Sequence, residues 1–139
     1  MIKRKGKRPK KSYRKQLESQ VERLQRLMVI KRDGGCVLRG VLQHQCSDIL
    51  QADHLLSRKY KSIFFDLRNL NCVCSSMNMQ KQWDCRIFLA LSKITENRSG
   101  EGTVDLLDKL SRVPSKMTIL DLETLVLTYR VELKIKKMR

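Results

Sequence analysis

Residues 49–78 read ILQADHLLSRKYKSIFFDLRNLNCVCSSMN, and they carry the strongest structural signal in the chain. Residues 49–55 form a short stretch that is apolar apart from Gln51, Asp53 and His54, which predicts a β-strand that carries Asp53 and His54 near its end. Residues 71–74 are apolar enough for a second short strand or a tight knuckle, and a helix is predicted over 78–94. We therefore expect a small α+β core in which two short strands precede a helix.

The segments on either side of this core are predicted to be helical. Apolar residues at three- and four-residue spacing indicate an amphipathic helix over 12–32, ended by a glycine turn at 33–35. After an expected loop at 96–102, a helix over 104–110 is stopped by Pro114, and a capping box at Thr118 opens a last helix. The predicted organisation is a basic disordered arm (1–15), an N-terminal helix with the core (16–95) and a C-terminal helical extension (96–139). The apolar residues of the first helix are Leu17, Val21, Leu24 and Met28.

The charge of the chain indicates a polyanionic partner. Thirty Lys and Arg residues against 14 Asp and Glu residues give a net charge of +16. Cations placed along phosphates release condensed counterions, so nucleic acid is the favoured partner. A ribosome-like RNA binder and a protein attracted to anionic membranes are the other readings of charge alone. No apolar run reaches the length of a membrane span, and no apolar region follows the basic N-terminus, so we expect a cytoplasmic protein without a membrane partner.

The first 15 residues are the most basic part of the chain. They contain nine Lys or Arg residues and no acid, interrupted by Gly6 and Pro9. Such a segment is predicted to be a disordered arm that lies along the nucleic-acid backbone. Its candidate DNA-binding residues are Lys3, Arg4, Lys5, Lys7, Arg8, Lys10 and Lys11.

The polar residues of the core suit phosphodiester hydrolysis. The carboxylate of Asp53 suits a hard divalent cation, and the imidazole of His54 suits a general base acting on water. Asn78 is a second oxygen ligand for the cation, a helix N-cap, or both at once. Asn69 is expected to tie the loop that carries the site by bonding backbone groups.

This set of residues resembles the HNH (ββα-metal) endonucleases. Asp53-His54, Asn69 and Asn78 match, in order, a metal-binding Asp, a base His, a structural Asn and a metal-binding Asn. The surrounding text, ADHLLSRKY and DLRNLNCVCSSMNMQKQWD, is similar to the lambda NinG/Rap family of phage recombination nucleases, and the likeness covers roughly residues 20–135. The resemblance implies an endonuclease that uses Mg²⁺ or Mn²⁺ to cut branched DNA such as Holliday junctions and D-loops, leaving 5′-phosphate and 3′-hydroxyl ends. Because a junction has paired strands to cut, we also expect a homodimer.

The cysteines depart from the pattern of this family. Proteins of this kind commonly carry two Cys-x-x-Cys knuckles that bind a structural zinc, whereas Cys36 is followed at the third position by Arg39 and Cys74 by Met77. Either Cys46 and Cys72 join Cys36 and Cys74 in a rearranged zinc site, or the zinc is lost and apolar packing by Leu38 and Met77 replaces it. The odd number of cysteines argues against a disulfide framework.

Several other residues have a functional and a structural interpretation. Arg58, Lys59 and Lys61 either grip phosphates beside the cut or form a solvated basic loop. Lys81 either contacts the same region or is an ordinary surface lysine. His44 is interpreted as a loop histidine or as a metal ligand beside Cys46. Trp83 and Cys85 are expected to be buried in the helix over 78–94.

Two other functions remain open at this stage. A less selective HNH nicking endonuclease would use every one of the same catalytic residues. A non-catalytic nucleic-acid-binding protein on a decayed HNH scaffold is favoured by the incomplete knuckles and opposed by the presence of Asp53, His54 and Asn78.

The basic arm gives a first prediction. Removing it should weaken DNA binding and make the remaining affinity less sensitive to salt, because fewer counterions are released on binding. Fluorescence anisotropy with a labelled duplex over a salt series measures both quantities. Unchanged affinity and an unchanged salt dependence would show that the arm does not contact DNA.

Overall fold

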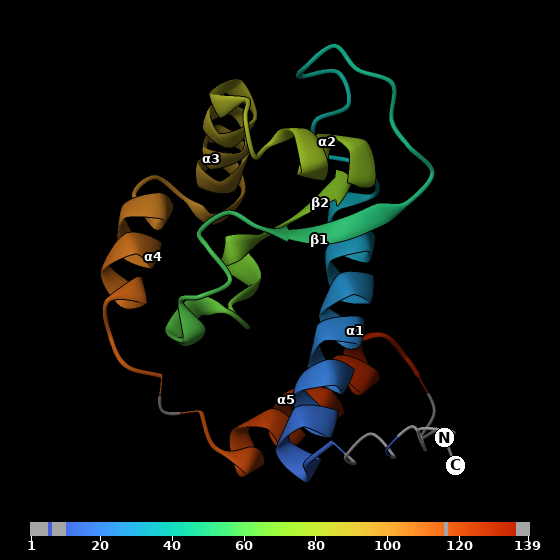
Figure 1. Cartoon of the computed structure of the whole chain (residues 1–139), viewed down its shortest axis with the longest axis vertical. Helices are drawn as coiled ribbons and strands as arrows, with labels where there is room; N and C mark the ends of the chain where they lie inside the picture. The colour runs from blue at the N-terminus through green and yellow to red at the C-terminus, as the bar shows by residue number, and fades with distance from the viewer. Residues whose placement is uncertain (1–5, 7–10, 116, 136–139) are drawn as a thin grey trace, which may run out of the picture.

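The sheet at the centre of the molecule has two antiparallel strands, β1 (Leu50–His54) and β2 (Leu70–Cys74). The structure, a computed structural model, describes residues 6, 11–115 and 117–135, which form an α+β protein with five α-helices (Figure 1). Two short 3₁₀ turns, η1 (Lys61–Ile63) and η2 (Leu67–Asn69), lie between the strands. The helices are α1 (Tyr13–Asp33), α2 (Ser75–Gln80), α3 (Cys85–Ser99), α4 (Thr103–Ser111) and α5 (Ile119–Glu132).

Helices cover both faces of this small sheet. The strands pair in a register that runs from Leu50 opposite Cys74 to His54 opposite Leu70. Val29 of α1 packs on one face against Leu70 and Cys72. The other side of the core joins residues of β2 and α2 to α3 and the segment after α1. Its buried members include Leu38, Val73, Met77, Ile87 and Leu91.

A second packing unit joins α1 to α5 at one end of the molecule (Figure 1). The two helices run in the same direction, because Arg14 donates to the carbonyl of Met117 and Lys31 donates to that of Glu132. The Nε2 amide of Gln25 donates to the Tyr129 hydroxyl, which satisfies a buried polar pair in this interface. Its apolar core is formed by Leu17, Val21, Leu24, Leu122, Val126 and Tyr129.

The predicted helix over 78–94 is wrong in its bounds, because the chain breaks at 81–84 into two helices. Asp84 caps α3 by accepting from the backbone N–H of Arg86. Trp83 and Cys85 lie at this junction and are exposed, Trp83 by 68%, so the expectation that both are buried is also wrong. Asn78 lies within α2, whose N-cap is Cys74, and it is therefore not a helix N-cap.

Other bounds differ by smaller amounts. Helix α3 continues to Ser99, so only 100–102 of the expected loop at 96–102 lies between helices. The expected boundary between the core (16–95) and the C-terminal extension (96–139) therefore falls inside α3. The capping box at Thr118 is confirmed, with Asp121 as its second member. Helix α1 begins at Tyr13, so residues 13–15 are helical and not part of a disordered arm. Among the described residues, no helix is long and apolar enough to cross a membrane.

Of the candidate residues in the arm, only Lys11 is described, and it is exposed. The remaining six lie outside the described residues. They are Lys3, Arg4, Lys5, Lys7, Arg8 and Lys10.

Asn69 fastens the loop between the strands to the end of β1. Its fully buried side chain accepts from the backbone N–H of Leu56 at 2.9 Å and donates to the carbonyl of the same residue at 3.2 Å. The backbone N–H of Leu55 donates to the carbonyl of Asn69 at 2.8 Å. The tie expected from the sequence is therefore present, and it holds the chain immediately after His54.

Replacing Asn69 by Ala should lower the free energy of unfolding by about 1–3 kcal/mol for each buried backbone group left without a partner. Urea unfolding followed by circular dichroism measures the change. Asn97→Ala, on the exposed side of α3, is the matched control and should be close to neutral. Equal effects of the two substitutions would show that the tie contributes nothing to stability.

Candidate functional site

Two adjoining hollows lie at the end of β1, with volumes of about 340 and 410 Å³. Both are bordered by His54, Arg58 and Asn78. Asp53 and Lys81 border the larger hollow. The structure thus brings Asp53, His54 and Asn78 to one cavity, whereas Asn69 is buried beside it.

The imidazole of His54 is held in one orientation and one tautomer. Its Nε2 lies 2.9 Å from the carbonyl oxygen of Phe64, and the two rings stack at 4.7 Å between centroids. A carbonyl only accepts, so Nε2 carries the proton and Nδ1 of the neutral ring keeps a lone pair. Burial lowers the pKa of His54, and the positive charges of Arg58, Lys81 and Lys61 lower it further. The side chain is therefore a neutral acceptor near pH 7, as a general base requires.

Asp53 is buried and already paired with a cation. Lys81 Nζ lies 2.7 Å from each carboxylate oxygen and 2.8 Å from the carbonyl oxygen of His54. Burial raises the pKa of Asp53, and the charge and hydrogen bonds of Lys81 oppose this rise. Lys81 is thus not a plain surface lysine, since its ammonium satisfies the buried carboxylate at the border of the larger hollow.

Asn78 comes from α2, one turn before Lys81, and faces β1. Its Nδ2 donates to the side-chain oxygen of Gln51 at 2.6 Å. This bond orients the amide group of Asn78. Gln51 engages the Nδ2 atom, and the Oδ1 atom is not used in this bond. An amide oxygen beside a carboxylate is a donor set that a hard divalent cation accepts.

The hollows have a basic rim in which Arg58 borders both of them, whereas Lys59 and Lys61 border neither. Arg58, Lys59 and Lys61 are all exposed, as both interpretations of these residues require. Lys61 Nζ lies 4.7 Å from the centroid of the Phe64 ring, and Arg58 lies 5.6 Å from the same ring. Cation–π contacts of this kind hold the charges near the end of β1. Arg58 also forms an exposed ion pair with Glu22 of α1, at 3.7 Å.

Helix α1 adds residues that the sequence did not single out. Arg23 and Arg26 border the smaller hollow together with Glu22. Arg26 donates to the carbonyl of Leu50 at 3.0 Å, which fixes its guanidinium against the start of β1. On the sequence these arginines look like any others on the polar face of an amphipathic helix, so no local signal marks them.

A second group of reactive side chains lies near the start of α2. The ligand atoms of Cys36, His44, Cys46 and Cys74 all lie within 4.8 Å of one another. Four ligands around a tetrahedral zinc, with Zn–S near 2.3 Å, would be separated by roughly 3.8 Å. The 3.9 Å between Cys36 Sγ and His44 Nε2 already meets this value. The group can therefore bind a metal ion with only small adjustments.

The protonation of these side chains also suits a metal. His44 donates from Nδ1 to the carbonyl of Leu42 at 2.7 Å, which leaves the lone pair of Nε2 toward the thiols. Burial opposes ionisation of Cys74, but hydrogen bonds from Ser76, Met77 and Ser47 outweigh it and lower the pKa of the thiol to about 6. Burial raises the pKa of Cys36, and the neighbouring thiols Cys74 and Cys46 add to this rise. Positive charge from a bound metal would relieve the repulsion between these groups.

Cys72, which we expected in this group, is not a member of it. It precedes Cys74 by one repeat of the strand, roughly 6.6 Å along β2, and packs with Val29 and Leu70 on the α1 side. Burial raises the pKa of Cys72 to about 11, with the charge of Asp33 adding to the effect. His44 takes the place that the sequence analysis gave to Cys72.

The structure bears on both interpretations of the incomplete knuckles. Leu38 and Met77 are buried in the same apolar cluster as Cys36 and Cys74, so apolar packing does fill the space beside the thiols. His44 and Cys46 come from a single loop, 39–49, and lie where they can act with the two remaining knuckle cysteines.

No protein-family model, no curated protein and no solved structure matches this chain.

The composition of the Cys/His group predicts one tightly bound metal ion per chain. We expect this ion to be zinc, because thiolates and imidazoles are the ligands of structural zinc sites. Protein purified without chelator should contain one equivalent by elemental analysis, and its removal should lower the melting temperature because binding is linked to folding. His44→Ala and Cys46→Ala should lose the metal, whereas Cys72→Ala should keep it. Protein without stoichiometric metal, or loss of the metal in Cys72→Ala alone, would contradict this assignment.

Proposed function

We propose that this chain is a metal-dependent DNA endonuclease of the HNH type, with His54 as its general base. The proposal rests above all on His54, whose imidazole is fixed by Phe64 and which borders a hollow shared with Asp53 and Asn78. The order of elements supports it, since β1, β2 and α2 follow one another as the ββα-metal core requires. The basic rim and the net charge of +16 support a polyanionic substrate.

In this mechanism His54 accepts a proton at Nδ1 from the attacking water. The water oxygen bonds to phosphorus, the bond from phosphorus to the 3′ oxygen breaks, and that oxygen takes a proton from solvent. The hydrogen bond from Nε2 to Phe64 keeps the ring oriented and becomes stronger as the ring gains charge. Arg58 supplies positive charge beside the phosphate.

Asp53 and Asn78 would hold the Mg²⁺ or Mn²⁺ ion that the resemblance implies. The ammonium of Lys81 is a stand-in cation on the Asp53 carboxylate, and the donors are the oxygens that such ions prefer. The ammonium has to leave the carboxylate before the ion can use both oxygens. When bound, the ion supplies Lewis-acid stabilisation of charge on the phosphate.

In this proposal the metal ion bound by the Cys/His group has a structural role and takes no part in cleavage. Zinc bound by Cys36, His44, Cys46 and Cys74 would join the end of α1, the loop 39–49 and the start of α2. Because Cys74 directly precedes α2, such a site would also fix the helix that carries Asn78 and Lys81.

The substrate class of this proposal is branched DNA, such as a Holliday junction or a D-loop. It rests on the similarity of residues 53–84 to the NinG/Rap family, because a basic rim gives affinity for phosphates and not selectivity among them. A nicking endonuclease without preference for branches uses the same His54 geometry and is the second candidate.

Cleavage of a four-way junction in Mg²⁺ or Mn²⁺ should exceed cleavage of a linear duplex of matched sequence. His54→Ala should reduce cleavage by about 10²–10⁴-fold, the usual contribution of a general base. Gel electrophoresis of end-labelled strands measures both quantities. Lys93→Ala, on the exposed side of α3 away from both hollows, is the control and should cleave as the wild type does.

The outcomes separate the candidate functions. His54→Ala should still bind the junction, so loss of cleavage with retained binding assigns the chemistry to the imidazole. Equal cutting of both substrates favours the nicking endonuclease. Tight binding without cleavage by the wild type in either ion would mean that the scaffold is not catalytic.

A further inference from the structure

Helix α5 is apolar on two opposite sides. One side packs against α1, and the side turned away from α1 carries large apolar residues that the described residues leave in solvent. A surface helix ordinarily presents polar residues there, so α5 has one apolar face more than this fold covers. The exposed fractions are 72% for Leu120, 63% for Leu127 and 77% for Val131.

Thr124 makes this exposed face continuous. Its hydroxyl donates to the carbonyl of Leu120 at 2.8 Å, and the hydroxyl of Thr128 donates to the carbonyl of Thr124 at 2.8 Å. Because both hydroxyls are satisfied within the helix, the surface left to neighbours is the methyl groups. We call Leu120, Thr124, Leu127 and Val131 the α5 stripe. It is an uncharged stripe on a chain of net charge +16.

The spacing of the α5 stripe is that of a helix-pairing seam. Its members are four, three and four residues apart, which is the alternation of d and a positions in a heptad repeat. A seam of this period fits the apolar seam of another helix running alongside it. The seam is short, because a helix of 14 residues is about 21 Å long.

The charges beside the stripe match a second copy of the same helix in the antiparallel direction. In this repeat Leu120 and Leu127 are d positions, and Thr124 and Val131 are a positions. An antiparallel pair places Leu120 against Val131 of the other copy and Thr124 against Leu127, so each contact joins a d position to an a position. Glu123 and Arg130 both occupy g positions, which face each other across such a pair. Neither forms an ion pair with any other described residue, and their charges are opposite.

We propose that two copies of this chain associate through the α5 stripe as an antiparallel, two-fold symmetric pair of α5 helices. By symmetry the Glu123–Arg130 pairing occurs twice. Helix α1 backs each α5, so the assembly is a layer of four helices, two from each copy.

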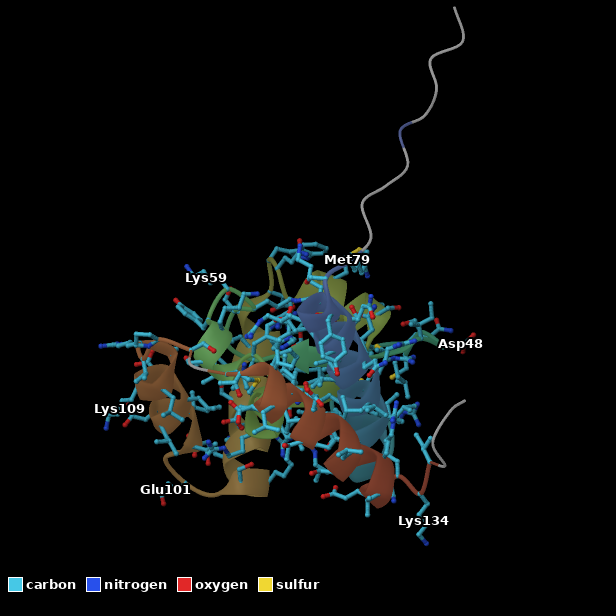
Figure 2. All side chains as sticks on the ribbon, turned by 90° about the horizontal axis from the view of Figure 1, so that it is seen from below. Asp48, Lys59, Met79, Glu101, Lys109 and Lys134 are labelled. Atoms are coloured by element: carbon cyan, nitrogen blue, oxygen red, sulfur yellow. The ribbon has the colours of Figure 1, made fainter. Side chains whose placement is uncertain are left out.

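No residue of the α5 stripe borders either hollow at β1. Helix α5 lies at the end of the molecule opposite α2 in Figure 1, and it faces the viewer in Figure 2, which looks at that end from below. The pairing rests on α5 alone and does not depend on the nuclease proposal. If both hold, each dimer carries two His54 sites.

Sedimentation equilibrium of the full chain over a concentration series tests the pairing, at moderate salt to screen the repulsion between two basic chains. We expect a monomer–dimer equilibrium. Leu127→Glu should weaken it by about a hundredfold, because the change occurs at two central positions of the interface. Leu89→Glu is the matched control, since Leu89 of α3 is exposed by the same 63% and its variant should dimerise normally.

A charge exchange tests the direction of the helices. Glu123→Arg and Arg130→Glu should each weaken self-association, because each variant places like charges together. An equimolar mixture of the two variants should form heterodimers, in which both facing pairs are again opposite in charge. The double variant should dimerise as the wild type does.

Three results would overturn the proposal. A wild-type chain that stays monomeric throughout the concentration series would assign the stripe to a different partner. A dimer that survives Leu127→Glu would use another face. A mixture that associates no better than its components would exclude the antiparallel register.

Discussion

The structure depends on one constraint, which is that two five-residue strands cannot form a stable sheet by themselves. All five residues of β2 are buried, so both faces of the sheet have to be covered by other elements. Helix α1 covers one face through Val29, and α2 and α3 cover the other. The polar residues of β1 lie at the edge of this packing, where Asp53 and His54 border a hollow. The helices that cover the sheet therefore position the candidate site, and α2 also contributes Asn78 to it.

Buried polar groups connect these layers and give them specificity. Asp33 at the end of α1 accepts from the backbone N–H of Cys72, which fixes that helix against β2. Arg98 of α3 donates to the side chain of Asn71, and Asn69 holds the loop that follows His54. Each of these bonds satisfies a group that would be costly to bury alone. The Lys81–Asp53 pair follows the same rule, because the ammonium satisfies a carboxylate that is buried beside the hollow.

The Cys/His group illustrates how a candidate metal site can form without a Cys-x-x-Cys motif. Arg39 and Met77 stand where the second cysteine of each knuckle would be, yet His44 and Cys46 of one loop come within ligand distance of Cys36 and Cys74. Two of its four residues come from one loop, and none of the four forms a Cys-x-x-Cys pair. Spacing rules written for paired knuckles cannot find such a set, because the loop 39–49 has no regular structure to predict.

By itself the sequence determined the first strand, the first and last helices, the capping box at Thr118 and the tie made by Asn69, because periodicity and capping are local properties. It left residues 71–74 open between a strand and a knuckle, and the pairing with β1 decided for the strand. It also selected Asp53, His54 and Asn78, which the fold brings to one hollow. Tertiary structure alone decided that the helix over 78–94 breaks before Asp84, that Lys81 pairs with Asp53, and that His44 and not Cys72 joins the thiols. These outcomes depend on which distant groups are buried together, and a local pattern carries no information about such neighbours.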